Sequence, residues 1–172
     1  MADRKQLLRV TTKLMSLLGL GFLVYVFMPG LFSDGESEQT NIVIDIGDLQ
    51  PGAVRVYSIA TGKLLVLKRT PAMIAELEAD DSGAYAFESN QNLATAMHPV
   101  FRSRTKELFV AYGIDPFYRC EVELIAASFK SVCVDVNYNL AGRVYKGRHA
   151  QGNLIVPDYQ IEADETLRIV DD

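Results

Sequence analysis

Only four side chains in this chain of 172 residues offer a thiol or an imidazole to a metal or a redox reaction. They are Cys120, Cys133, His98 and His149. The two histidines are far apart in the sequence, and neither has a cysteine, aspartate or glutamate beside it at a ligand spacing. The sequence therefore predicts no metal site of the His/Cys type and no catalytic residues, and it leaves the two cysteines as the remaining reactive pair.

An uncharged apolar run from Leu14 to Phe32, with Leu20 and Val24 near its middle, precedes these residues. Its 19 residues would span roughly 28 Å as a helix, close to the hydrocarbon thickness of a bilayer. Basic residues come before the run and acidic residues after it, which places the N-terminus in the cytoplasm by the positive-inside rule. These flanking residues are Arg4, Lys5, Arg9 and Lys13 on one side and Asp34, Glu36 and Glu38 on the other.

A cleaved secretory signal peptide is the alternative for this run. Its apolar core is usually shorter and ends in a small-residue cleavage pattern, whereas here residues 28–33 read MPGLFS. We therefore expect a cytoplasmic N-terminus (1–13), a transmembrane helix (14–32), a flexible polar linker (33–40) and a periplasmic domain (41–172), held in a bacterial inner membrane.

The charge of the part beyond the apolar run limits its partners. Residues 33–172 contain 13 Lys and Arg against 21 Asp and Glu, a net charge of −8. Such a surface makes nucleic acid an improbable partner and would steer a basic protein, such as a soluble cytochrome c, toward it. Solubility is a simpler explanation for the same charge.

The remaining pattern is mainly β. Alternating or short apolar segments separated by turn residues predict an antiparallel β-sandwich. The sequence Arg69-Thr-Pro71 opens one short helix over 72–79, with proline in the favoured first turn. Strands are expected at 42–46, 54–56, 63–68, 108–112, 121–125, 132–136, 154–156 and 167–170.

Three segments in the second half carry a family resemblance: residues 113–120 (GIDPFYRC), 131–143 (SVCVDVNYNLAGR) and 153–159 (NLIVPDY). In this order they resemble the Rieske iron–sulfur proteins, the iron–sulfur subunits of ubiquinol-cytochrome c reductases. The family patterns are G-I-C-T-H-L-G-C, C-P-C-H-G-S-x-Y-D-x-x-G-R and N-L-x-V-P-x-Y. The resemblance covers roughly residues 45–170 and implies a Rieske-like β-sandwich head behind the membrane anchor.

The same resemblance places four residues at the ligand positions of the family's [2Fe–2S] cluster. Asp115 and Ser131 stand where the two cysteine ligands would be, and Phe117 and Val134 stand at the two histidine positions. Phenylalanine and valine donate no lone pair, and a carboxylate with a hydroxyl does not replace two thiolates. Asp115, Ser131 and Asp135 are also too few for a calcium-type oxygen site. We expect no cluster, no metal and no other cofactor.

Cys120 and Cys133 match the two further cysteines that form a disulfide in the family. The pairing is also plausible from the residues alone, because both lie on β-patterned segments in an oxidising compartment. It would stabilise the fold by about 3 kcal/mol on the chain-entropy model. Two free buried thiols remain an alternative, and so does a redox-active disulfide, although Asp135 beside Cys133 does not provide the usual electropositive setting.

The resemblance thus implies a non-catalytic accessory subunit, a membrane-anchored Rieske-like head without its cluster. Its partners would be integral subunits of a respiratory complex, either a quinol:cytochrome c oxidoreductase, a terminal oxidase or their supercomplex. The alternatives are a genuine electron-transfer subunit with unusual ligation, or a periplasmic thiol–disulfide protein.

Overall fold

A computed structural model describes residues 2–32, 42–80, 82–94, 97–163 and 165–170. The chain divides into two compact units, residues 1–39 and 40–172. The predicted linker, residues 33–40, lies outside the described residues.

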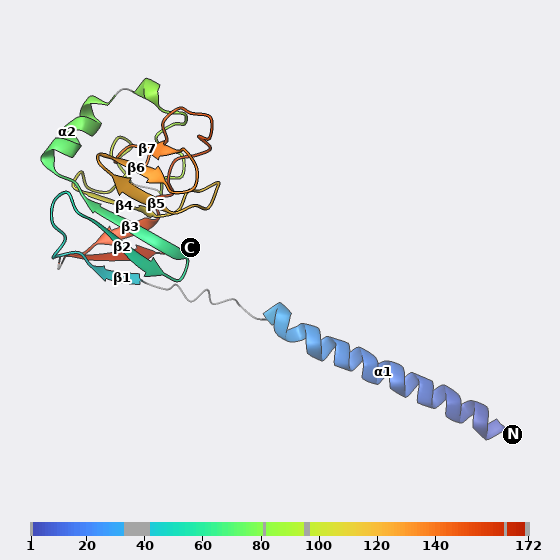
Figure 1. The fold of residues 1–172 in the computed structure, drawn as a ribbon. Coiled ribbons are helices and arrows are strands. Elements are labelled where there is room, and N and C mark those ends of the chain that lie inside the picture. Colours follow the sequence, from blue (N-terminus) through green and yellow to red (C-terminus); the bar gives the residue numbers. More distant parts are fainter. Residues whose placement is uncertain (1, 33–41, 81, 95–96, 164, 171–172) are drawn as a thin grey trace. The chain divides into compact units, whose positions relative to one another are not determined.

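The first unit contains one continuous helix, α1 (Ala2–Phe32) (Figure 1). Its window Leu8–Val26 is long and apolar enough to cross a membrane, with a mean hydropathy of 1.3. This window overlaps the predicted span 14–32, and Leu14, Leu20 and Val24 are exposed on the helix. α1 is therefore a candidate transmembrane helix.

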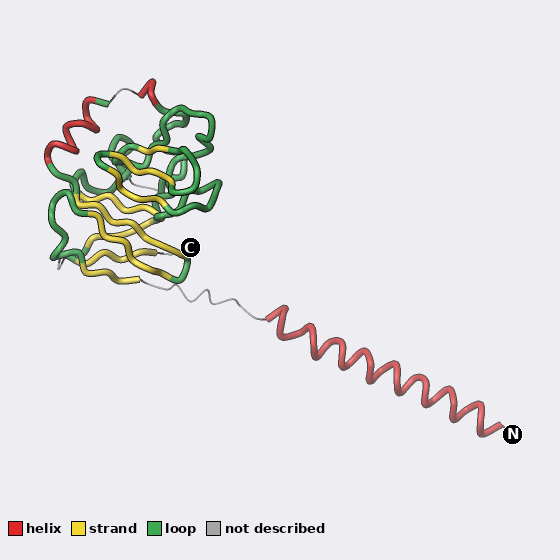
Figure 2. Tube along the Cα trace, viewed as in Figure 1, coloured by secondary structure: helices red, strands yellow, loops and turns green. Residues whose placement is uncertain are grey.

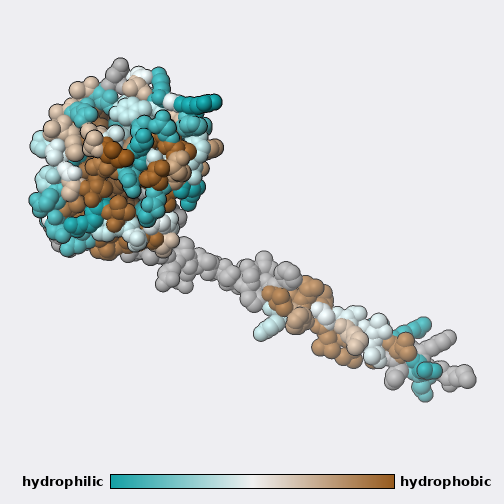
Figure 3. Space-filling view, viewed as in Figure 1, coloured by the Kyte–Doolittle hydropathy of each residue, from teal (hydrophilic) through white to brown (hydrophobic). Residues whose placement is uncertain are grey.

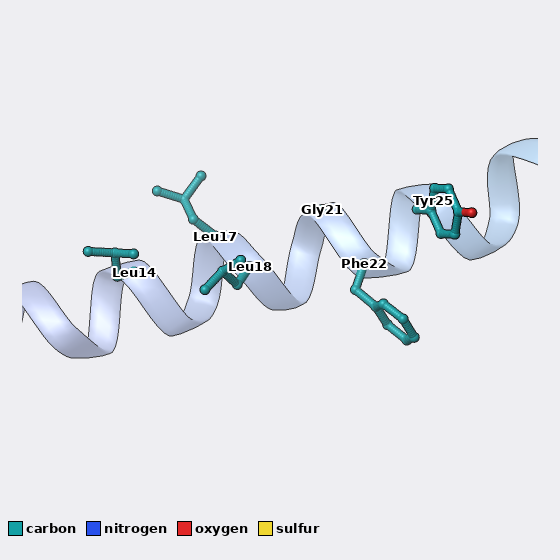
Figure 4. A pocket seen from close by; sticks show the side chains of 6 residues that line it. All are labelled: Leu14, Leu17, Leu18, Gly21, Phe22 and Tyr25. Atoms are coloured by element: carbon teal, nitrogen blue, oxygen red, sulfur yellow. The ribbon is translucent and has the colours of Figure 1, made fainter.

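Two hydroxyl side chains of α1 are satisfied within the helix. The Thr12 hydroxyl donates to the Leu8 carbonyl at 2.8 Å, and the Ser16 hydroxyl donates to the Thr12 carbonyl at 2.9 Å. Such internal bonds suit a segment surrounded by lipid, which offers no partner of its own. In Figure 3 the hydrophilic residues of α1 lie toward its N-terminal end and the apolar residues along the rest. A shallow groove on the helix is lined by Leu14, Leu17, Leu18, Gly21, Phe22 and Tyr25 (Figure 4).

The second unit, the head, is mainly β, as predicted, with antiparallel pairing in three sheets of three strands (Figures 1 and 2). The first sheet has the order β1 (Ile42–Asp45), β9 (Thr166–Val170), β8 (Asp158–Ile161). The second has the order β2 (Val54–Ile59), β3 (Gly62–Lys68), β4 (Leu108–Tyr112). The third has the order β5 (Val122–Ile125), β6 (Ser128–Ser131), β7 (Asn137–Tyr138).

Strand β3 is the centre of the core. Its residues 64–67 (LLVL) are fully buried, because β2 and β4 pair with its two edges and other elements cover both faces. A strand buried on both faces reads as a continuous apolar run instead of an alternating one. Phe109 on β4 packs its ring 5.7 Å from that of Phe129 on β6, which ties the second sheet to the third.

The predicted short helix is α2 (Pro71–Ala79), and its start follows from local chemistry. Thr70 is the N-cap, and its hydroxyl oxygen accepts a hydrogen bond from the Met73 amide at 3.3 Å. Pro71 lies in the first turn, where its missing N–H removes no helical bond. A 3₁₀ turn, η1 (Ser82–Ala84), follows α2.

Two predicted strands are wrong. Val132, Val134 and Val136 alternate in sequence but form a turn after β6, in which the Val136 amide donates to the Val134 carbonyl at 2.9 Å. Val132 is 55% exposed, so the alternation does not reflect one buried face.

Residues 154–156 are buried but do not form a regular strand. The Leu154 amide donates to the Gly142 carbonyl at 2.9 Å, and the Val156 amide donates to the Asn92 carbonyl at 3.0 Å. Both acceptors lie in irregular segments, so burial here comes from packing between loops.

Two buried guanidinium groups hold these irregular segments. Arg69 is 2% exposed and donates to the carbonyls of Phe101, Lys106 and Leu140 and to the Ser103 hydroxyl, at 2.8–3.2 Å. Desolvation lowers the pKa of Arg69 to about 9, which still leaves it protonated at neutral pH. The five N–H donors of the Arg69 guanidinium thus connect the segment 101–106 and residue 140 to the start of α2.

Arg102 repeats this arrangement and is fully buried. Its guanidinium donates to the carbonyls of Ser89, Gln91 and Asn92 and to that of Leu154, the last at 2.6 Å. Burial lowers its pKa to about 10. The Arg102 guanidinium therefore connects the segment 89–92 to residue 154. The pattern of apolar residues in the sequence did not indicate this buried charge.

Candidate functional site at the two loops of the head

Residues 113–121 form the first loop, a tight reversal between β4 and β5. The Asp115 amide donates to the Cys120 carbonyl at 2.7 Å, and the Arg119 amide donates to the Asp115 carbonyl at 3.0 Å. Arg119 has a φ of +59°, in the left-handed region that closes such turns. The loop therefore closes by backbone hydrogen bonds of its own.

The Asp115 side chain organises the interior of this loop. It is 2% exposed, and its Oδ1 accepts hydrogen bonds from the amides of Phe117 at 2.9 Å and Tyr118 at 2.6 Å. Aspartate commonly holds a turn in this way, by accepting from amides two and three residues later. The residue at a predicted cysteine-ligand position thus supports the loop backbone.

The second carboxylate oxygen of Asp115 is bound by Tyr138. The Tyr138 hydroxyl, fully buried on β7, donates to Asp115 Oδ2 at 2.5 Å. Burial, followed by the hydrogen bond to Asp115, raises the pKa of Tyr138 well above its usual value near 10. The hydroxyl of this packed aromatic residue therefore binds a side-chain carboxylate.

Residues 131–137 form the second loop, and a disulfide joins it to the first. Cys120 and Cys133 are bonded, with Cα atoms 5.9 Å apart, so the alternative of two free thiols does not apply. The Val132 amide also donates to the Glu121 carbonyl at 2.9 Å. Cys120 is 8% exposed and Cys133 is exposed, so the bridge is accessible from the side of the second loop.

The four predicted ligand positions are in very different surroundings. Asp115 is buried, Ser131 is buried at the end of β6, Val134 is half-buried, and the Phe117 ring is 62% exposed. The Ser131 hydroxyl has no hydrogen-bond partner among the described residues. The Phe117 ring packs edge-on against Tyr118, with centroids 4.9 Å apart.

These residues do not fit a [2Fe–2S] cluster. Such a cluster needs two thiolates and two imidazoles, but both sulfur atoms of the chain's cysteines are used in the disulfide. Both oxygens of Asp115 already accept hydrogen bonds from the protein. Among the described residues, no group of three or more His, Cys, Asp or Glu side chains lies close enough to hold a metal ion.

A third loop, residues 145–150, lies against the first. His149 Nδ1 lies 3.3 Å from the Tyr118 hydroxyl, and the two rings meet edge-on with centroids 5.9 Å apart. A cavity of about 250 Å³ lies between this loop and residues 135–137. We call the three loops, 113–121, 131–137 and 145–150, the tip.

No family model matches the chain. The ubiquinol-cytochrome c reductase iron-sulfur subunit of Allochromatium vinosum is 26% identical over 185 residues, covering 98% of this chain and 89% of that protein. A solved structure described as a hyperthermophilic respiratory Complex III contains a chain with a TM-score of 0.49 and 19% identity, covering 91% of this chain and 96% of that one.

The chain is a Rieske-like protein, with a mainly β head and an N-terminal candidate transmembrane helix. It is related to the iron–sulfur subunits of ubiquinol-cytochrome c reductases over nearly its whole length.

Proposed function

We propose that the chain is a non-catalytic accessory subunit of a respiratory membrane complex, with a Rieske-like head that carries no iron–sulfur cluster. One observation carries the proposal. The loops that would enclose a cluster are closed by protein groups alone, the Asp115 carboxylate with its three donors and the bridge between Cys120 and Cys133. A head with these loops fixed and no iron ligands would serve in contacts with other subunits instead of electron transfer.

The host complex is a quinol:cytochrome c oxidoreductase, a terminal oxidase or a supercomplex of the two. The similarity to an iron-sulfur subunit of ubiquinol-cytochrome c reductase supports the first of these. A net charge of −8 over residues 33–172 supports a basic cytochrome c as a transient partner of the assembly.

The iron content of the purified chain tests the absence of the cluster. We expect substoichiometric iron and no electron-spin resonance signal of a reduced [2Fe–2S] centre. The related Allochromatium vinosum subunit, prepared in the same way, is the matched positive control. A stoichiometric signal from this chain would show a genuine electron-transfer subunit with unusual ligation and would overturn the proposal.

Purification in mild detergent tests the accessory role. We expect integral subunits of a respiratory complex to co-purify with the chain. If the chain is recovered without such subunits from cells that express the complex, the accessory role is contradicted. The complex found in the sample also identifies the host.

We also propose that α1 remains in the mature protein, with the N-terminus in the cytoplasm and the head in the periplasm. Replacing Leu20 and Val24 with arginine puts two charges into the candidate span and should release the chain from membranes, because each costs about 3 kcal/mol at a helix centre. The control is the pair Leu20→Ile and Val24→Ile, which keeps the segment apolar. Protease added to spheroplasts should digest the head, and protection of the head would reverse the assigned orientation.

The exposure of Cys133 favours a second candidate, a thiol–disulfide protein. An attacking thiolate would reach Cys133 and displace Cys120 as the leaving thiolate. Alkylation after treatment with a mild dithiol tests this function. A bridge that stays intact in the folded chain and is reduced only after unfolding excludes it.

A further inference from the structure

The tip differs from the rest of the head in charge. Three exposed cations, Arg119, Lys146 and Arg148, form no ion pair among the described residues. All of them belong to the tip, although residues 33–172 as a whole have a net charge of −8. The acidic character of the head therefore stops at these loops.

The carboxylates of the tip do not cancel these cations. Asp115 is buried and bound by three donors, and Glu121 pairs with Lys63 at 2.7 Å. Asp135 lies 3.5 Å from the Lys130 ammonium. Glu121 and Asp135 are thus paired with cations from outside the tip, whereas Asp115 keeps its charge behind neutral donors. The three exposed cations with Lys63 and Lys130 count +5 against −3 for these three carboxylates, which leaves a net charge of +2 at the tip.

Two large apolar side chains of the tip are also exposed. Phe117 is 62% exposed and Val132 is 55% exposed, and the disulfide joins their two loops. His149 against Tyr118 joins the third loop, which carries Lys146 and Arg148, to the loop of Phe117. Exposed aromatic and apolar residues with cations around them are the composition of an interfacial membrane contact.

We propose that the tip docks on the surface of a bilayer containing anionic phospholipid, with Phe117 and Val132 in the interfacial region and the cations against lipid phosphates. Charge complementarity selects this face, since the rest of the head is acidic on balance and is repelled by the same lipids. Contacts of this size are weak for a free protein. Here nine residues, 33–41, connect α1 to β1 and span at most about 30 Å, so an anchored head stays close to the lipid surface.

The proposal needs the membrane anchor but not the host complex, and the purified full-length chain can test it. The sequence contains no tryptophan, so Phe117→Trp creates a single fluorescent reporter. The variant is placed in nanodiscs of phosphatidylcholine with brominated acyl chains, with or without phosphatidylglycerol. We expect bromine to quench the indole fluorescence of this variant only when phosphatidylglycerol is present, and high salt to abolish the quenching.

Matched variants separate docking from mere proximity. Val56→Trp puts a reporter on β2, at a site 51% exposed in another sheet, and should show no quenching. Arg119→Gln in the Phe117→Trp chain should lower the ratio of docked to free head about fivefold, from about 1 kcal/mol per cation near an anionic surface. Arg168→Gln, which removes a cation already paired with Glu162, is the control and should leave the ratio unchanged.

Three results would overturn the proposal: no quenching of the reporter at position 117, equal quenching in neutral nanodiscs, or equal quenching of the reporter at position 56. These results do not bear on the accessory role, which is tested separately by co-purification. If the reporter at position 117 is not quenched but Phe117→Ser abolishes co-purification, the tip binds a protein. That result would reject the lipid surface and leave the accessory role intact.

Discussion

The loops around Arg69 and Arg102 and the loops of the tip are both irregular in structure. The interactions that hold the first set are buried in the head, whereas those that hold the tip lie near the surface. At the first region, fully or almost fully buried guanidinium groups donate to carbonyls from segments far apart in sequence. At the tip, a disulfide and a carboxylate join residues within about 25 positions of one another, with Cys133 and Phe117 at the surface.

This difference predicts that removing an interaction lowers the stability of the head by different amounts in the two regions. A buried guanidinium that is removed leaves several carbonyls without partners and without water, so the whole head should lose stability. A crosslink of the tip that is removed frees loops next to solvent, which can hydrate the released groups. The loops of the tip can therefore vary in sequence at a lower cost than the loops held by Arg69 and Arg102.

The largest effect is expected from Arg69→Met, which keeps much of the side-chain volume but removes all five hydrogen bonds. We expect a loss of about 3–5 kcal/mol in the free energy of unfolding, measured by denaturation of the full chain in detergent. The control is Arg168→Met, which breaks a partly exposed pair with Glu162 and should cost below about 1 kcal/mol. An equal loss of unfolding free energy in the two variants would contradict the greater importance of the buried guanidinium groups.

Replacing both cysteines, Cys120→Ser with Cys133→Ser, should have the next largest effect. We expect a loss of about 3 kcal/mol from the greater entropy of the unfolded chain. Hydrogen exchange should speed up in residues 131–137 and remain slow in β3, because the disulfide joins loops at the tip. Faster exchange in β3 under native conditions would mean that the tip supports the core as well.

Asp115→Asn should cost less, about 1–3 kcal/mol. The amide keeps one acceptor oxygen for the amides of Phe117 and Tyr118, but its NH₂ group faces the Tyr138 hydroxyl in place of Oδ2. The control is Asp135→Asn, since the side chain of Asp135 is 81% exposed and its pair with Lys130 is long at 3.5 Å. A neutral effect at Asp115 would show that its charge does not hold the first loop.

The smallest effect, about 1 kcal/mol at neutral pH, is expected from Tyr138→Phe. Its pH dependence is more specific. Because the folded pKa of Tyr138 is raised above the unfolded value near 10, its contribution is complete below pH ~10 and is lost as the pH rises beyond it. Tyr145 and Tyr159, whose pKa values are also raised, remain in both proteins, so the difference between wild type and variant isolates Tyr138. A constant difference up to high pH would contradict the burial of this hydroxyl.

The sequence predicted most of the fold where a local pattern and a tertiary contact agree. The strand 108–112 and the helix beginning at Pro71 were found because apolar spacing and capping residues are local signals. Prediction failed at Val132, Val134 and Val136, since alternation on a turn does not mark a buried face. It also missed the role of Arg69, because an arginine in sequence gives no sign that backbone carbonyls will surround it.

At the site, the sequence alone determined which chemistry is missing: two cysteines and two histidines, with Asp115, Phe117, Ser131 and Val134 at the resembling positions, leave no donor set for a cluster. The composition of the chain and the order of its motifs are sufficient to show that this donor set is incomplete. Only the tertiary structure decided what holds the two loops, namely the Asp115 carboxylate between Tyr138 and two amides and the bonded pair of cysteines. It also brought the three loops of the tip together, two of which carry the unpaired cations Arg119, Lys146 and Arg148. The reason is physical, since hydrogen bonding and net local charge depend on which distant residues meet.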